Sequence, residues 1–133
     1  MAIRYYKYQN KSNIQKVNGK WFLRVKNGDT VDIDQLAAHM ASHSTAYTEG
    51  ELSGMIKDVV NCIIELVLDG KQVKLPNLAI FSLGIKCHGA DDPSTATVAN
   101  IHNIHINARG TGKFSSTQLR EKCKFKEMDA YSL

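Results

Sequence analysis

Hydrophobic and polar positions alternate along residues 3–9, IRYYKYQ, as they do in a half-buried β-strand. A second strand is predicted within residues 17–29, VNGKWFLRVKNGD, between two Asn-Gly dipeptides. Such dipeptides favour the positive φ angles that tight turns require. The first 30 residues therefore predict a β-hairpin or meander.

The period then changes to that of a helix. Apolar residues recur at helical spacing after Asp32 and Asp34, either of which suits the N-cap, and this predicts a short helix over residues 32–42. Thr48, with a glutamate three residues later, forms the T-x-x-E of a capping box at the start of a long helix over residues 48–68.

The long helix is predicted to end at Asp69-Gly70, because glycine is free to adopt the left-handed conformation. Short strands, QVKL and AIFSLGIK, follow on either side of a tight turn at Pro76-Asn77. After the polar residues 87–97, VANIHNIHINA returns as a strand, and SSTQLREKCKF reads as a short final helix. This order of elements predicts an α+β fold.

The second half of the long helix is apolar on two sides. A chain of 133 residues has little core with which to cover both sides, so we expect a second copy to cover one of them. Residues 32–42 and 48–68 would then form the body of a homodimer. The residues expected in its core are Ile63, Ile64, Val67 and Phe81. The alternative is that the N-terminal hairpin covers the second side.

Charge is unevenly distributed along the chain. The net charge is +4, but residues 1–30 carry +6, residues 31–70 carry −6 and residues 71–113 carry +3. Basic strands and acidic helices predict one face for a polyanion and another face turned away from it. The alternative is that solvated strands simply contain lysine.

Composition narrows the class of protein. No segment has the roughly 18 consecutive apolar residues of a membrane span. The N-terminus lacks the apolar core of a signal peptide, so we expect a cytoplasmic protein with no membrane partner. Cys62, Cys87 and Cys123 form no C-x-x-C pair and are interpreted as reduced thiols, with Cys62 buried on the long helix.

Candidate chemistry is sparse. Cys87, His88, His102 and His105 are residue types that zinc prefers, but their spacing is not that of a zinc finger, and solvent exposure on a hairpin explains them more simply. We expect no metal and no cofactor. No glycine-rich phosphate loop or activated nucleophile is recognisable, so we expect no enzyme.

The segment RYYKY, residues 4–8, has two interpretations. Its aromatic and basic side chains suit a strand that stacks bases and holds phosphates, as in proteins that bind single-stranded nucleic acids. The simpler interpretation, which the sequence favours, is a strand with buried tyrosines and solvated lysines.

From Val31 to about Cys123 the chain resembles the HU and integration host factor family of bacterial DNA-bending proteins. The resemblance lies in VDIDQLAAHMASHSTAYTEGELSGMIKDVVNCIIELVLDGKQVKLPNLAIFSLG and, more weakly, in SSTQLREKC. It implies an HU-like (IHF-like) fold, in which the helices of two subunits interlock beneath a β-sheet and each subunit extends a two-stranded arm around DNA. Phe81 takes the place of the family's buried phenylalanine, and Asn77 and Ala79 stand where the family usually has glycines.

The basic segment at residues 1–30 is similar to the N-terminal extensions of HU-related variants. The expected domains are therefore this extension, packed on the body, and an HU-like domain over residues 31–133. The resemblance implies a non-enzymatic, histone-like architectural protein of the nucleoid that binds double-stranded DNA largely independently of sequence.

The resemblance also indicates where DNA would bind. The first expected contacts are Lys74 and Lys86 on the outgoing strands, with Arg109 and Lys113 after the return strand. The cations of the basic hairpin come second, because no family motif places them: Lys7, Lys20, Arg24 and Lys26. Pro93 comes last, as a candidate for the proline that wedges between base pairs. The arm departs from the family pattern, because Asp91 and Asp92 next to the proline would repel phosphate. The alternative function is an HU-like scaffold that binds a protein partner and has lost strong DNA bending.

Overall fold

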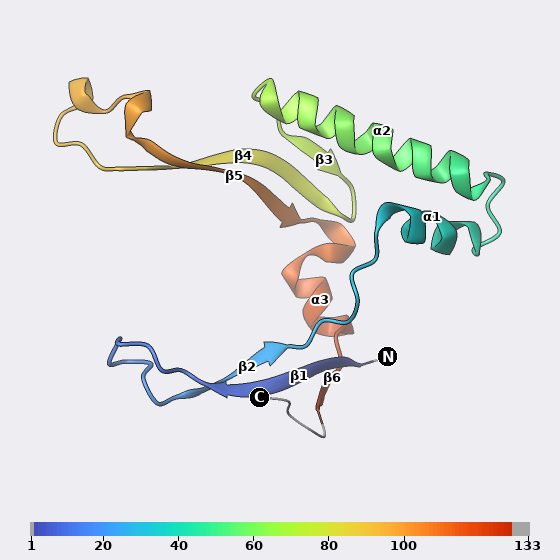
Figure 1. Cartoon of the computed structure of the whole chain (residues 1–133), viewed down its shortest axis with the longest axis horizontal. Coiled ribbons are helices and arrows are strands. Elements are labelled where there is room, and N and C mark those ends of the chain that lie inside the picture. Colours follow the sequence, from blue (N-terminus) through green and yellow to red (C-terminus); the bar gives the residue numbers. More distant parts are fainter. Residues whose placement is uncertain (1, 129–133) are drawn as a thin grey trace. The chain divides into compact units, whose positions relative to one another are not determined.

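The computed structural model describes residues 2–128 (Figure 1). The contacts divide the chain into two compact units, each described by itself. The central unit comprises residues 31–118, and the N-terminal unit comprises residues 1–30 and 119–133. Both helices and strands are present, so the predicted α+β class is confirmed. Residues 129–133 of the expected HU-like domain lie outside the described residues.

Two helices open the central unit, α1 (Ile33–Ala41) and α2 (Glu49–Leu68). Asp32 is the N-cap of α1 and Thr48 is the N-cap of α2, and each takes part in a complete capping box. The two helices pack on each other, and the buried Ser53 hydroxyl on α2 donates a hydrogen bond of 2.7 Å to the Asp34 carboxylate on α1. Both predicted helices are therefore confirmed.

The end of α2 follows the predicted glycine cap. Gly70 has a φ of +81°, and its backbone N–H donates to the Val67 carbonyl. The Lys71 N–H reaches back to the Leu66 carbonyl, which completes the hydrogen-bond pattern of a Schellman motif. The chain then reverses into the first strand of the central sheet.

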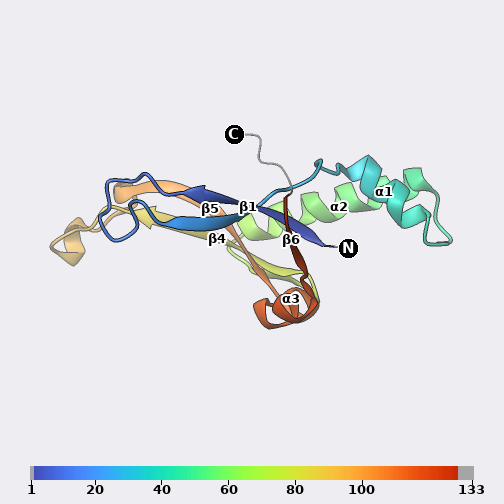
Figure 2. The same cartoon turned by 90° about the horizontal axis from the view of Figure 1, so that it is seen from below.

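The central sheet is antiparallel and contains β3 (Val73–Leu75), β4 (Ala79–Cys87) and β5 (Ile101–Gly110), in that order. Helix α2 lies beside β3 and β4 (Figure 1). Strands β4 and β5 continue side by side as a two-stranded extension (Figure 2). The sequence placed the start of β5 too early, because residues 98–100 form a turn of 3-10 helix instead of a strand.

The turn between β3 and β4 has the predicted Pro76-Asn77 at its centre. The Leu78 N–H donates to the Leu75 carbonyl at 3.0 Å, and Asn77 has a φ of +65°. Proline at the first central position and a left-handed residue at the second are typical of a type II turn. Asparagine adopts this conformation more readily than other side chains do, which explains how it stands in place of glycine.

Few side chains are buried in the single chain. Among the described residues, the buried apolar side chains are Ala37, Leu52, Val67 and Ala79, and no large side chain is fully buried. Of the other residues expected in a dimer core, Ile63 and Phe81 are half-buried and Ile64 is 52% exposed.

The prediction that Cys62 is buried is wrong for the single chain, where the side chain is exposed. Cys62 lies one residue before Ile63, and therefore about 100° round the helix from the stripe that packs inward. All three cysteines are free thiols.

A second sheet forms in the N-terminal unit. Its strands are β1 (Ile3–Gln9), β2 (Trp21–Val25) and β6 (Phe125–Glu127), with β1 in the middle. The predicted hairpin corresponds to antiparallel β1 and β2. The third strand was not predicted: α3 (Ser116–Lys122) is shorter than the expected final helix, and β6 pairs in parallel with β1.

Candidate nucleic-acid interface

The register of the central sheet separates its side chains into two faces. Successive residues of a strand point to opposite faces, and residues directly opposite each other share a face. Ala79 and Phe81 on β4 pair with Leu75 and Val73 on β3, so these four share the apolar face next to α2. The other face, which we call the polar face, contains the alternate residues of the same strands.

A basic row crosses the polar face. Ile80 on β4 is opposite Lys74 on β3 and also opposite Arg109 on β5. Lys74 and Arg109 are both exposed. Two cations therefore flank one apolar side chain across the full width of the three-stranded sheet.

Uncharged polar side chains continue this face toward the extension. Ser82 is opposite Asn107, and Lys86 is opposite Asn103. Gln72, Ile80, Ser82, Asn107 and Arg109 are among the residues that line a shallow hollow of about 480 Å³. The face therefore offers both cations and hydrogen-bonding groups.

The environment of Gly84 brings two more polar groups to this face. An added Cβ at Gly84 would lie 2.5 Å from His105 Nε2 and 2.6 Å from Asn107 Nδ2. Both side chains therefore lie over the glycine, in space that a larger residue on β4 would occupy. The His105 ring also hydrogen-bonds with the Asn103 side chain at 3.1 Å.

The strands of the central sheet, β3, β4 and β5, contain no aspartate or glutamate. The cations of the polar face consequently have no acidic neighbour on their own strands. A surface of this charge attracts polyanions, and phosphate oxygens are acceptors for lysine, arginine and asparagine donors.

The other predicted contacts in the central unit lie outside the strands. Lys113 is exposed in the short 3-10 turn after β5, and its backbone N–H donates to the Asn77 side chain at 3.1 Å. Pro93 is exposed and begins a 3-10 turn beyond the two-stranded extension, where the Asp92 carboxylate caps the Ser94 N–H. The acidic side chain next to the proline is therefore already engaged with the backbone of the tip.

The four predicted cations of the hairpin do not lie on one face. Arg24 is opposite Tyr6 on β1, and Phe22, two positions away, shares that face. Lys26 follows β2 and continues the pairing, because its N–H donates to the Arg4 carbonyl at 2.8 Å. Lys7 lies on the other face, where its ammonium pairs with the Glu127 carboxylate at 3.4 Å. Lys20 precedes β2, and its carbonyl accepts from the Asn10 N–H.

The histidines and cysteine considered as zinc ligands do not form a metal site within residues 2–128. The rings of His88 and His102 are 4.4 Å apart, centre to centre, but no group of three or more potential ligands gathers anywhere in the described part of the chain. In the same part of the chain, no helix combines the length and the apolar character that crossing a bilayer requires.

Comparison with known proteins identifies the family of the chain. Residues 1–126 match the HU-HIG family, described as an HU domain fused to wHTH, Ig, or Glycine-rich motif. The chain belongs to this family. The predicted relationship to HU proteins is thereby confirmed, and the match includes the N-terminal strands as well as the central unit.

This HU-HIG chain is also similar to a solved structure, the crystal structure of a "Putative bacterial DNA binding protein" from Bacteroides vulgatus ATCC 8482. The TM-score is 0.67 at 8% sequence identity, so the likeness is one of fold. It covers 96% of this chain and 48% of that one, so this chain spans about half the length of its structural relative. No curated protein matches.

Several residues of the candidate interface were missed from the sequence. On the polar face they are Ser82, Asn103, His105 and Asn107, whose alternation with isoleucines in NIHINAR is visible in the sequence once the strand register is known. On the N-terminal sheet, Arg4 is opposite Lys126 on β6. That pairing has no signal in the sequence, because β6 itself was not predicted.

Proposed function

We propose that this HU-HIG chain is a non-enzymatic, architectural DNA-binding protein of the nucleoid that binds double-stranded DNA with little dependence on sequence. The observation that carries the proposal is the polar face of the central sheet, with Lys74 and Arg109 in one row and no acidic residue on its strands. The family membership and the fold shared with a structure described as DNA-binding support the same partner.

The chemistry of this face favours phosphate contacts. Exposed lysine and arginine side chains neutralise backbone phosphates and release counterions, which gives affinity without reading bases. Lys86 extends the basic surface to the two-stranded extension, and Lys113 adds a cation after β5. Binding through these groups explains why little sequence preference is expected.

A homodimer is part of the proposal. On α2, Val59 is 46% exposed, Val60 is 41% exposed and Ile64 is 52% exposed in the single chain. Apolar exposure of this extent along one helix is costly in water and marks a surface that another molecule covers. A second copy that covers α2 and the half-buried Phe81 would form the interlocked body implied by the resemblance to HU, with one extension on each side.

The extension then serves as an arm. Pro93 at its tip is a candidate wedge between base pairs, but the neighbouring Asp91 and Asp92 weaken its approach to phosphates. We therefore propose a protein that holds duplex DNA on its sheet and bends it less than a protein with a basic arm would.

Fluorescence anisotropy with a short labelled duplex tests the proposal. Arg109→Glu should weaken binding to unrelated duplex sequences by a similar factor, because it repels phosphates in any sequence. Lys57→Glu makes the same charge change on α2, away from the polar face, and is the matched control. Equal loss of affinity in both variants would show that only net charge matters and would refute the assignment to this face.

A further inference from the structure

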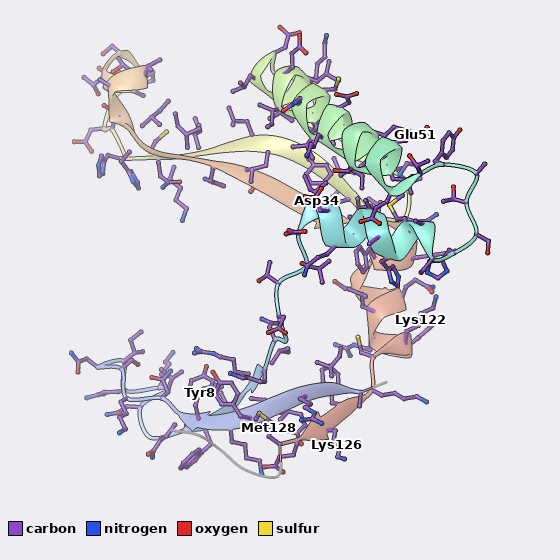
Figure 3. All side chains as sticks on the ribbon, turned by 45° about the vertical axis from the view of Figure 1, so that its right-hand side comes forward. Tyr8, Asp34, Glu51, Lys122, Lys126 and Met128 are labelled. Atoms are coloured by element: carbon purple, nitrogen blue, oxygen red, sulfur yellow. The ribbon has the colours of Figure 1, made fainter. Side chains whose placement is uncertain are left out.

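The N-terminal sheet contains a second surface with its own chemistry. Strand register places Arg4, Tyr6 and Tyr8 of β1 on the same face as Arg24 and Phe22 of β2. On the other side of β1, Lys126 is opposite Arg4. We call this the aromatic-basic face. Figure 3 labels Tyr8 and Lys126 on the strands of this sheet.

The aromatic groups of this face are held in place. The rings of Tyr8 and Phe22 are opposite each other, with centroids 5.9 Å apart and planes tilted by 32°. The Arg24 guanidinium lies over the Tyr8 ring, 4.5 Å from its centroid. The planar guanidinium is therefore oriented by the ring beneath it.

The neighbouring tyrosines also favour the charged form of Arg24. Side-chain hydrogen bonding and electrostatics from Tyr6, and then from Tyr8, raise the pKa of Arg24 above its ordinary value. The guanidinium is exposed, and its outer surface faces away from Tyr8. It is a preformed flat, cationic platform, of the kind on which unpaired bases stack.

Charge separates this face from the other side of the sheet. Arg4, Arg24 and Lys126 share the aromatic-basic face, and Lys26 joins them because its N–H donates to the Arg4 carbonyl just beyond β2. The strand residues on that face include no acid. The acidic residue of β6, Glu127, is opposite Tyr5 on the other face and pairs there with Lys7. The sheet therefore presents four cations on one side, where no carboxylate from its strands competes for them.

The same unit contains a hollow of about 820 Å³ that reaches this face. Its lining includes Tyr6, Tyr8, Arg24, Lys11, Lys26 and Met128, and also Lys7, Gln9, Trp21 and Val25 from the alternate strand positions. This volume lies within the range of sites that take small ligands such as a nucleotide. Aromatic rings, a stacked guanidinium and lysines around one hollow combine base stacking with phosphate binding.

We propose that the aromatic-basic face is a second nucleic-acid site, which takes unpaired bases of single-stranded DNA or RNA. Bases of a duplex are stacked on one another and cannot reach a flat platform, whereas an unpaired base can lie against Arg24 while its phosphates contact Arg4, Lys26 or Lys126. The site lies within the N-terminal unit and does not depend on the duplex-binding function proposed for the central sheet.

The test compares strands that differ only in their bases. Labelled oligo(dT) and oligo(rU) are titrated with the full chain, and an abasic deoxyribose-phosphate strand of the same length supplies the phosphates alone. The base-containing strand should bind at least about tenfold more tightly than the abasic one, because stacking of a base contributes measurably to affinity. Equal affinity for the abasic strand and for both base-containing strands would overturn the proposal.

Variants then locate the site. Tyr8→Leu should weaken oligo(dT) binding by about tenfold, whereas Phe125→Leu, which removes an exposed ring from the opposite face, should not. Arg24→Lys keeps the charge and removes the planar stack, so it should weaken binding to oligo(dT) and leave binding to the abasic strand unchanged. Circular dichroism checks that each variant is folded.

A final pair of measurements distinguishes the two sites. Lys86→Glu/Arg109→Glu should reduce duplex binding and leave oligo(dT) binding within about twofold of wild type. Loss of both activities in this variant would mean that single strands bind to the central sheet, and the second site would be rejected. If wild type fails to bind duplex but still binds oligo(dT) through Tyr8, the further inference stands while the proposed function falls.

Discussion

Lys74 on β3 and Arg109 on β5 lie on either side of Ile80, in one row across the polar face of the central sheet. The two cations come from positions 35 residues apart in the sequence, and the sheet brings them to the same surface. A row of this kind can contact successive phosphates of one backbone. The contribution of each cation to DNA affinity can therefore be measured by replacing that residue alone.

Neutralising either member of the row should lower the salt dependence of duplex binding. Each phosphate contact contributes about −0.9 to the log–log slope, so Lys74→Gln or Arg109→Gln, which removes one contact from each subunit of a dimer, should flatten the slope by about 1.8. Salt titrations followed by anisotropy measure this change. Lys57→Gln on α2 should leave the slope as it is, and a similar flattening in that variant would contradict the assignment.

The turn at Asn77 should require both the left-handed conformation and the side-chain amide. Asn77 has a φ of +65°, and its side-chain oxygen accepts from the Lys113 N–H at 3.1 Å. Asn77→Ala loses both contributions and should cost about 2 kcal/mol. Asn77→Gly keeps the conformational freedom and loses only the hydrogen bond, so it should cost about 1 kcal/mol.

Urea unfolding measures the two free energies. The order of the two variants is the critical result: if Asn77→Gly is less stable than Asn77→Ala, the conformation at this position does not limit the turn.

Two glycines of the central sheet should respond differently to the same substitution. An added Cβ at Gly110 would collide with the backbone carbonyl of Phe114, whereas at Gly84 it meets only the ends of the His105 and Asn107 side chains. Side-chain ends can move, but a backbone carbonyl held in a turn moves at a cost. Gly110→Ala should therefore destabilise by about 1–3 kcal/mol and Gly84→Ala by less than about 1 kcal/mol. Thermal unfolding of the two variants side by side gives the comparison.

The dimer proposed for α2 predicts that Phe81 contributes more to the free energy of unfolding than its half-buried state in one chain indicates. Phe81→Ala should cost about 3–5 kcal/mol if a second copy completes its burial, and less than about 1 kcal/mol if the residue is peripheral. Ile64→Glu should shift sedimentation toward a monomer or prevent folding. Asn61→Glu, which adds the same charge to the polar side of α2, should remain dimeric. A well-folded wild-type monomer at micromolar concentration would contradict the dimer.

Sequence patterns predicted the elements that are determined locally. The N-cap at Asp32, one of two candidates, the capping box at Thr48 and the glycine cap at Gly70 are signals in which a few neighbouring residues satisfy the backbone, and all three are present in the structure. The same holds for the tight turn at Pro76-Asn77.

The pairing of strands that are far apart in the sequence was harder to predict. Strand β6 is three residues long, and Phe125 and its neighbours form a strand because β1 offers them an edge, not because their own pattern requires it. The division of the hairpin cations also depends on pairing: Lys7 and Arg24 look equivalent in the sequence, but register puts them on opposite faces. The absence of acidic residues from β3, β4 and β5, in contrast, is a property of the strand sequences themselves and can be predicted without the structure.

The salt dependence of duplex binding by the wild-type protein tests the central claim most directly. If the polar face binds phosphates through two or three cations in each subunit of a dimer, the slope of log affinity against log salt should be roughly −4 to −5. Lys86→Glu/Arg109→Glu should flatten that slope and weaken binding to all duplex sequences alike. A wild-type protein that fails to bind duplex DNA even at about 50 mM salt would contradict the account.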